Sequence, residues 1–248
     1  MRLTFLGNGI MAEAMISRLL KLDYKIEVFG RDEKKLSDFR EKFDKKIETF
    51  TYKNDTDISD KTVILCVKPH ALQQISHFFK GEAKLIVSVL AGTSIETLKK
   101  EINAKSYVRA MPNIAAFYGK SMTTITGDKT SKDEVLKILN SIGKTLWVES
   151  EKELDIATVL AGSSPAFLAL VAESLIDGAV KEGLKRADAF TLAKGLFEGF
   201  AELLENYPHP AFIKDAVMSP NGVTAKGYAT LEDYKVRSAF MKIYQKNI

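Results

Sequence analysis

Short apolar runs alternate with amphipathic segments over the first 150 residues of this 248-residue chain. Several runs are almost wholly apolar, as in strands that a sheet buries on both faces. The segments between them have the 3.6-residue periodicity of helices, and the alternation predicts a mostly parallel α/β sheet. The expected strands are Arg2–Leu6, Lys25–Phe29, Thr62–Val67, Leu85–Leu90, Tyr107–Ala110, Met122–Ile125 and Thr145–Val148. The expected helices between them are Met11–Lys21, Glu33–Phe43, Ala71–Phe79, Ile95–Lys100 and Lys132–Ile142.

The pattern changes near Ser150, after which no β-rich run follows. Ser150 and Glu153 have the spacing of a capping box at a helix start. The apolar residues from Ala166 to Ala172 are too continuous for a helix with one buried face, which predicts a dimer interface here. We expect an α/β domain over residues 1–150 and an all-α domain over residues 151–248. The expected helices of the second domain are Leu154–Leu160, Ala166–Glu182, Ala187–Asn206, Ala211–Val217 and Ala225–Lys246, the last broken near Asp233.

Composition and charge exclude several classes of function. The net charge of +4 comes from 36 basic and 32 acidic residues spread along the chain, which argues against a nucleic-acid surface. A single cysteine, Cys66, rules out an internal disulfide and fits a reducing, cytoplasmic compartment. Because Met1 and Arg2 lead directly into a strand, we expect no signal peptide, and we expect no apolar stretch of the ~20 residues that a membrane span needs. The three histidines lack metal-binding spacing, so no metal is expected.

A glycine-rich segment follows the first expected strand and opens the first expected helix. Its spacing is that of a dinucleotide-binding fingerprint of Rossmann type. The first glycine allows a tight turn, the second lets the backbone approach the pyrophosphate, and Ala12 keeps helix and strand close. The N–H groups of the helix N-terminus then bind the phosphates. The residues expected to hold the cofactor here are Gly7, Asn8, Gly9, Ile10 and Met11.

The end of the second strand bears on the choice between NAD and NADP. An acid at this position would bind the ribose 2′-hydroxyl of NAD, but the strand ends Val28-Phe29-Gly30, with no acid directly before Arg31. The planar guanidinium suits a 2′-phosphate, so NADPH is the expected cofactor and NADH a possible one. Asp32, one position further on, leaves the NAD interpretation open. Other cofactor contacts are expected from Asn54 and, at the carboxyl end of the third strand, from Val67, Lys68 and Pro69.

Further motifs extend the set along the whole chain. They are Ser88-x-x-Ala91-Gly92, Arg109-x-Met111-Pro112-Asn113, Gly162-Ser163-Ser164-Pro165-Ala166 and Ser219-Pro220-Asn221-Gly222-Val223-Thr224. With the fingerprint and Val67-Lys68-Pro69, these six motifs in order resemble the pyrroline-5-carboxylate reductase family.

The resemblance implies NAD(P)H-dependent reduction of 1-pyrroline-5-carboxylate to L-proline, the last step of proline biosynthesis. It adds Ala91 and Asn113 to the cofactor-binding residues, and it implies a homodimer that can assemble further, for example into a decamer. The chain departs from the family at Ser164, Asn221 and Val223. Asparagine tolerates a left-handed backbone, whereas Ser164 would be strained if the conformation of the missing glycine were needed.

Reduction of a cyclic imine needs a hydride donor and a proton on nitrogen. Because the imine is basic enough to arrive protonated, the enzyme's main task is orientation. Backbone N–H groups of Gly222, Val223 and Thr224 at a helix N-terminus can hold the substrate carboxylate. The resemblance implies that the Thr224 hydroxyl forms a hydrogen bond with the ring nitrogen of the substrate. Ser219 and Ser163 are expected to make further substrate contacts. The alternative for Thr224 is a helix N-cap.

Three other functions remain in view. β-Hydroxyacid dehydrogenases share the architecture but need a lysine on the first helices of the second domain, and Leu154 to Ile176 contains none. A deazaflavin-linked reductase would leave the Ser219–Thr224 loop without a purpose. A non-catalytic NADP-binding regulator is disfavoured because the motifs at both ends of the chain are intact.

Overall fold

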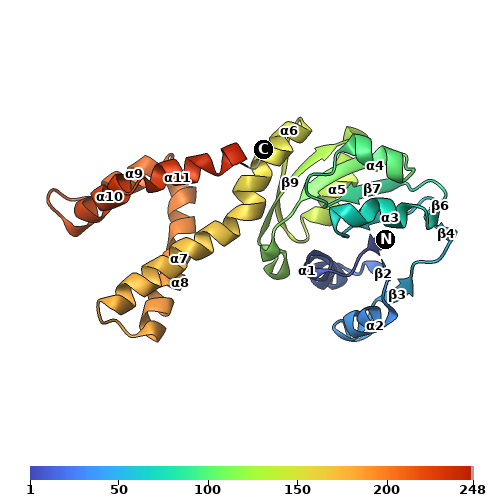
Figure 1. Cartoon of the computed structure of the whole chain (residues 1–248), viewed down its shortest axis with the longest axis horizontal. Coiled ribbons are helices and arrows are strands. Elements are labelled where there is room, and N and C mark those ends of the chain that lie inside the picture. Colours follow the sequence, from blue (N-terminus) through green and yellow to red (C-terminus); the bar gives the residue numbers. More distant parts are fainter. Residues whose placement is uncertain (247–248) are drawn as a thin grey trace. The chain divides into compact units, whose positions relative to one another are not determined.

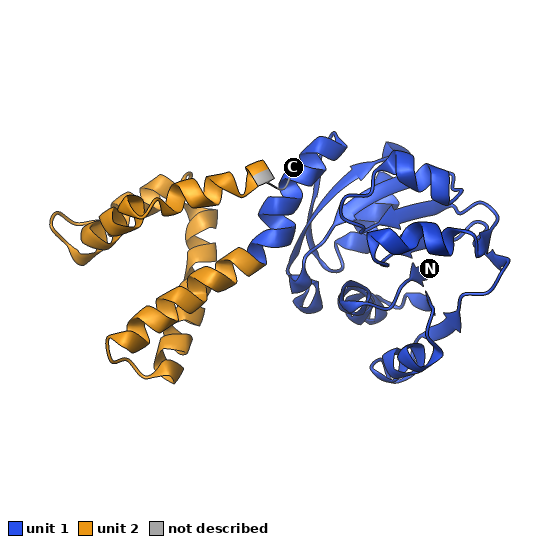
Figure 2. Ribbon diagram, viewed as in Figure 1, with its two compact units in different colours: residues 1–165 blue, residues 166–248 orange. Residues whose placement is uncertain are grey.

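An eight-stranded sheet forms the centre of the first of two compact units, Met1–Pro165 and Ala166–Ile248 (Figure 2). The computed structural model describes residues 1–246. The strand order is β10-β9-β8-β7-β5-β1-β2-β3, and every neighbouring pair is parallel except β8 with β9. From β3 to β8 this is the 3-2-1-4-5-6 order of doubly wound dinucleotide-binding sheets. The predicted α/β fold is confirmed.

All seven predicted strands are present, and β3, β4 and β6 were not predicted. The strands are β1 (Arg2–Leu6), β2 (Lys25–Gly30), β3 (Glu48–Thr51), β5 (Thr62–Leu65), β7 (Leu85–Ser88), β8 (Tyr107–Met111), β9 (Ser121–Gly127) and β10 (Gly143–Trp147), with the short pair β4 (Thr56–Asp57) and β6 (Phe79–Lys80) apart from the main sheet. β3 lies at the sheet edge and alternates exposed with half-buried positions, so it lacks the apolar run of a central strand. β5 and β7 end two residues before the predicted ends, because the chain there leaves the sheet to line a cavity.

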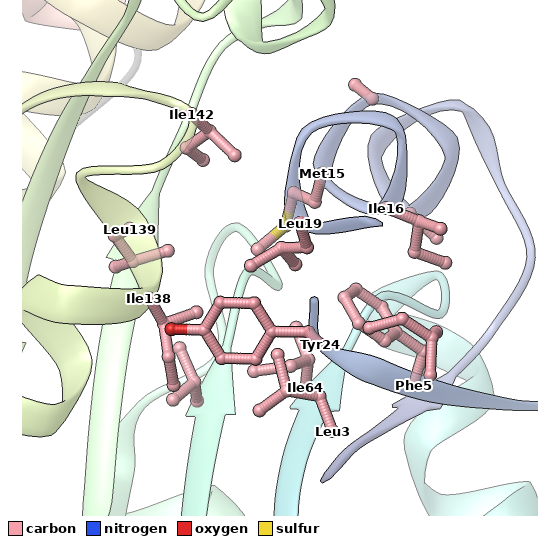
Figure 3. Packing of buried hydrophobic residues seen from close by; sticks show 14 of the residues in the cluster. Leu3, Phe5, Met15, Ile16, Leu19, Tyr24, Ile64, Ile138, Leu139 and Ile142 are labelled. Atoms are coloured by element: carbon pink, nitrogen blue, oxygen red, sulfur yellow. The ribbon is translucent and has the colours of Figure 1, made fainter. Parts of the chain in front are cut away.

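Helices cover both faces of the sheet (Figure 1). Side chains of α1 (Ile10–Leu19), α2 (Glu33–Glu41) and α5 (Lys132–Leu139) join one buried cluster, and those of α3 (Leu72–Ser76) and α4 (Ile95–Glu101) join another. Neighbouring strand residues alternate between the clusters, so Phe5 packs in the first and Leu6 in the second. Figure 3 shows the first cluster, where Leu19 of α1 and Ile138 of α5 lie near Tyr24, and Ile16 of α1 lies over Phe5.

α6 (Glu151–Ala157) begins at the predicted capping residue. The Ser150 Oγ accepts a hydrogen bond from the Glu153 N–H at 3.2 Å, and the Glu153 carboxylate accepts one from the Glu149 N–H at 2.9 Å. Because α6 packs on β8 and β9, the first compact unit continues to Pro165. A π-helical turn, Thr158–Ser163, then joins α6 to α7 (Ser164–Lys181). Inserted turns of this kind are frequent at functional sites.

The second unit is helical, as predicted, and no strand follows Trp147 among residues 148–246. Its remaining helices are α8 (Arg186–Asn206), α9 (Pro210–Val217), α10 (Val223–Asp233) and α11 (Val236–Lys242). The predicted break near Asp233 is confirmed, because Lys235 adopts a left-handed conformation with φ 57° between α10 and α11.

The helical stretch Glu151–Lys181 corrects one expectation. Its 31 residues have an 18-residue window of mean hydropathy 1.7, so it is long and apolar enough to cross a membrane by length and composition. The prediction that no such stretch exists was wrong. Thr, Gly and Ser residues between Thr158 and Ser164 break the run of apolar residues, but they carry no charge, so the mean hydropathy of the window stays high. Helices that pack inside proteins pass the same test, and only 11% of this window is buried within the chain.

Candidate functional site

A cavity of about 650 Å³ lies where β1, β2, β5 and β7 end at the carboxyl edge of the sheet. β1 and β5 flank the point at which the strand order reverses, which is the ligand-binding position in doubly wound folds. Ten residues predicted to bind the cofactor line this cavity. They are Gly7, Asn8, Gly9, Ile10, Met11, Arg31, Val67, Lys68, Pro69 and Ala91.

The turn between β1 and α1 has the shape that a pyrophosphate requires. Gly7 has φ 108°, and a Cβ atom there would lie 2.7 Å from the carbonyl oxygen of Cys66, so only glycine fits. A Cβ on Gly9 would meet no atom within 4 Å, so the space in front of the helix start is open. Among the described residues no side chain caps α1, which leaves the first-turn N–H groups free for an anion. These features fit a dinucleotide.

The end of β2 presents Arg31, and Asp32 has a different role. The Asp32 carboxylate accepts a hydrogen bond from the Lys35 N–H at 2.9 Å and so caps α2. Arg31 is exposed and lines the cavity. The arrangement therefore favours the arginine as the residue that meets the ribose of the cofactor.

Two predicted cofactor residues do not line the cavity. Asn54 lies in an exposed turn, and Tyr52, two residues earlier, lines the cavity instead. Asn113 is 8% exposed, and both polar atoms of its side chain have protein partners. Its Oδ1 accepts a hydrogen bond from the Ala115 N–H at 3.0 Å, and its Nδ2 donates to the Ala161 carbonyl at 2.8 Å. Asn113 therefore fastens the chain after β8 to the π-helical turn.

Several lining residues were missed from the sequence. Cys66 and Val89 directly follow the observed ends of β5 and β7, and Leu90 comes next, so shorter strand predictions would have indicated them. Ile75 on α3 and Ile114 after β8 give no such signal, because their place depends on how α3 and the chain after β8 pack. Burial raises the pKa of the Cys66 thiol, so this side chain is a neutral, apolar part of the wall.

Arg109, from the Arg-x-Met-Pro-Asn motif, is a buried structural residue. Its guanidinium is 2% exposed and donates to Glu151 Oε1 at 2.8 Å and to Asp155 Oδ1 at 2.9 Å, both on α6. Glu151 Oε1 also accepts a hydrogen bond from the Ile95 N–H, at the start of α4. One arginine thus links β8, α4 and α6.

Ser163 and Ser164 belong to the motif that follows α6. Ser163 is exposed in the π-helical turn. Ser164 has φ −62° and ψ −20°, an ordinary right-handed conformation, and its hydroxyl donates to the Val159 carbonyl at 3.0 Å. Replacement of the family's glycine therefore introduces no strain at this position.

The Ser219–Thr224 loop of the second unit forms a tight turn into α10. Asn221 has φ 57°, which is the left-handed conformation that asparagine was expected to tolerate here. A Cβ on Gly222 would lie 2.3 Å from Ser219 Oγ, and the Gly222 N–H donates to the Ser219 carbonyl at 3.0 Å. Gly222 is the N-cap of α10 and Thr224 is its second residue, so the N-cap alternative for Thr224 was wrong. The α10 N-terminus has no side-chain cap among the described residues, and Thr224 is exposed.

A dinucleotide cavity at the reversal point of a doubly wound sheet, followed by a helical unit, defines a two-domain nicotinamide-dependent reductase. The chain is 34% identical to a pyrroline-5-carboxylate reductase of Helicobacter pylori, over 99% of this chain and 97% of the relative. It is 36% identical to that of Synechocystis, over 97% of this chain and 93% of the relative. The chain therefore belongs to the pyrroline-5-carboxylate reductase family.

Family models and solved structures agree with this assignment. Residues 151–248 match the model for pyrroline-5-carboxylate reductase dimerisation, and residues 2–92 match that for coenzyme F420-dependent NADP oxidoreductases. The pyrroline-5-carboxylate reductase of Streptococcus pyogenes is similar with a TM-score of 0.87 and 26% identity, over 100% of this chain and 96% of that one. The Plasmodium falciparum pyrroline carboxylate reductase with NADP bound gives a TM-score of 0.83 and 26% identity, over the same shares. The first unit is thus an NADP-binding domain and the second carries the family's dimerisation domain.

Proposed function

We propose that this protein reduces 1-pyrroline-5-carboxylate to L-proline with NADPH, in the cytoplasm. Two features of this family member together support the proposal. One is the cavity beside Gly7 and Gly9, and the other is the helix start at Gly222, which no side chain caps among the described residues. The first suits a dinucleotide and the second suits a small carboxylate. The single cysteine supports a reducing compartment.

Bound NADPH supplies the hydride, and the residues of this chain orient the two reactants. The N–H groups at the start of α1 hold the pyrophosphate, and Arg31 holds the 2′-phosphate. The N–H groups of Val223 and Thr224 hold the substrate carboxylate. The protonated ring nitrogen donates a hydrogen bond to the Thr224 hydroxyl, which directs the C=N carbon toward the hydride. One hydride on carbon converts the iminium directly into the secondary amine, so no general acid is required.

The helical unit is proposed to form a homodimer, which can assemble into a larger ring such as a decamer. Large apolar side chains support this proposal, because Leu170 of α7 is 64% exposed and Leu192 of α8 is also 64% exposed. A second copy would cover these surfaces. The match of residues 151–248 to a dimerisation model supports the same arrangement.

Light scattering and an activity assay test the proposal together. The full chain should be at least a dimer at micromolar concentration and should oxidise NADPH when 1-pyrroline-5-carboxylate is added. A folded protein that oxidises neither NADPH nor NADH would refute the activity. A monomer with normal turnover would refute the proposed assembly alone.

A further inference from the structure

Tyr52 carries a buried hydroxyl that the proposed mechanism does not use. The residue follows β3 and lines the cofactor cavity beside Arg31. Its Oη is buried and has no hydrogen-bond partner among the residues that the structure describes. Buried hydroxyl groups in native proteins nearly always have a partner, because an unpaired one costs free energy. This orphaned atom therefore requires an explanation.

Packing explains the ring of Tyr52 but not its hydroxyl. The ring stacks on Phe78, with centroids 6.0 Å apart and planes 12° from parallel, and meets the edge of Phe79 at 5.7 Å. A phenylalanine ring would make the same contacts, and the two neighbours are themselves phenylalanines. A ligand bound in the cavity would give this oxygen a hydrogen-bond partner.

The chemistry of the hydroxyl indicates an anionic partner. Burial raises the pKa of Tyr52, so the group is a neutral donor at physiological pH. The charge of Arg31 acts on the same pKa in the opposite direction, which places the guanidinium within electrostatic range of the hydroxyl. An anion held by Arg31 at the end of β2 would therefore lie near a donor that has no other partner.

We propose that the Tyr52 hydroxyl is a specificity-determining donor to the 2′-phosphate of NADPH, acting together with Arg31. The inference rests on the proposed NADPH preference and adds a second, neutral group to it. Because Oη is buried, a neighbouring side chain must turn to admit the phosphate. Arg31 is the exposed neighbour with the rotatable bonds to do so.

Tyr52→Phe tests the proposal, because it removes the oxygen and keeps the ring. NADPH and NADH differ only in the 2′-phosphate, so calorimetric titration of the full-length protein with each isolates that contact. We expect the dissociation constant for NADPH to rise about tenfold, as for loss of a hydrogen bond to a charged group, and that for NADH to stay unchanged. The melting temperature without cofactor should stay the same or rise, because a buried unpaired group has been removed.

Tyr107→Phe is the matched control. The Tyr107 hydroxyl is also buried, but it donates to the Ile102 carbonyl and accepts from the Ala104 N–H, both at 2.8 Å, and the residue does not line the cavity. This variant should melt at a lower temperature and bind both cofactors normally. A Tyr52→Phe protein that melts lower in the same way would overturn the proposal, as would unchanged NADPH binding or equal weakening of both cofactors.

Arg31→Ala separates failure of this inference from failure of the NADPH preference on which it rests. If Arg31→Ala weakens NADPH selectively and Tyr52→Phe does not, only the role of Tyr52 is refuted. If wild-type protein binds NADPH no more tightly than NADH, the proposed preference itself is refuted.

Discussion

The two units of this chain bury their apolar residues very differently. In the first, strand residues such as Leu3, Phe5 and Leu6 are fully buried under helices on both faces of the sheet. In the described part of the second, only Ala189, Ala193 and Ile213 are buried apolar residues, although its helices are rich in leucine and phenylalanine. The first unit thus contains its own core, whereas the second presents the apolar side of an interface.

Energetics give the difference its meaning. Full burial of one large apolar side chain contributes roughly 1.5–3 kcal/mol. Exposed side chains on α7 and α8 forgo that contribution within a single chain, and they are Leu168, Leu170, Leu175, Phe190, Leu192, Leu196, Phe200, Leu203 and Leu204. We therefore expect the second unit to depend on assembly for stability.

The largest expected effect comes from a variant that prevents assembly through the second unit. Leu170→Asp places a charge on the most exposed leucine of α7 and should convert the assembled protein into a monomer without reductase activity. Tryptophan fluorescence should be unchanged, since Trp147, the single tryptophan, lies in β10 of the first unit. Light scattering and the activity assay measure both results. Leu22→Asp, at a 56% exposed position of the first unit, is the control and should assemble normally.

A second change tests the self-sufficient unit. The double variant Glu151→Gln with Asp155→Asn leaves the Arg109 cation buried without a carboxylate, which should cost about 3 kcal/mol of unfolding free energy. Urea unfolding followed by Trp147 fluorescence measures this loss. Glu96→Gln breaks the exposed pair with Lys100 and should cost far less, because solvent screens that pair. Equal effects of the two variants would mean that Arg109 does not hold α6 on the sheet.

Thr224→Ala separates chemistry from stability in the second unit. Since Gly222 is the N-cap, removal of the Thr224 hydroxyl should change the melting temperature little. Catalytic efficiency should fall about tenfold or more, because a hydrogen bond to a charged nitrogen contributes ~1.5–3 kcal/mol. Thr224→Ser should retain most activity. Normal catalytic efficiency of Thr224→Ala would contradict the role of Thr224 and would indicate that Ser163 or Ser219 contacts the imine instead.

The smallest expected effect concerns cofactor choice in the first unit. Arg31→Ala should raise the KM for NADPH roughly tenfold, through loss of a charge-assisted contact of about 1.5 kcal/mol, and leave the KM for NADH unchanged. Steady-state kinetics with both cofactors measure the ratio. Equal changes would show that Arg31 does not read the 2′-phosphate.

The sequence predicted best where local pattern and burial agree. The turn from Gly7 to Met11, the central strands and the left-handed Asn221 all follow from residue type alone. The edge strand Glu48–Thr51 was missed because exposure on one side removes the apolar run. The capping role of Gly222 could not be separated from Thr224, since cap position depends on backbone angles that a sequence does not specify.

Positions set by tertiary contacts were the least predictable part of the site. Asn54 and Tyr52 are two residues apart, and only the path of the chain after β3 decides which side chain lines the cavity. Asn113 was predicted to bind the cofactor from the family resemblance. Its side chain instead donates to the Ala161 carbonyl in the π-helical turn, and no sequence pattern reveals that contact. The domain boundary at residue 150 remains a prediction, because α6 packs on the sheet while the dimerisation model begins at residue 151.

One assay tests the central claim most directly, that this protein transfers a hydride from the nicotinamide cofactor to 1-pyrroline-5-carboxylate. Purified full-length protein is mixed with 1-pyrroline-5-carboxylate and either NADPH or NADH, and cofactor oxidation and proline are measured together. We expect one proline for each cofactor oxidised, with higher kcat/KM for NADPH. Folded, assembled protein that binds NADPH yet forms no proline with either cofactor would contradict the account.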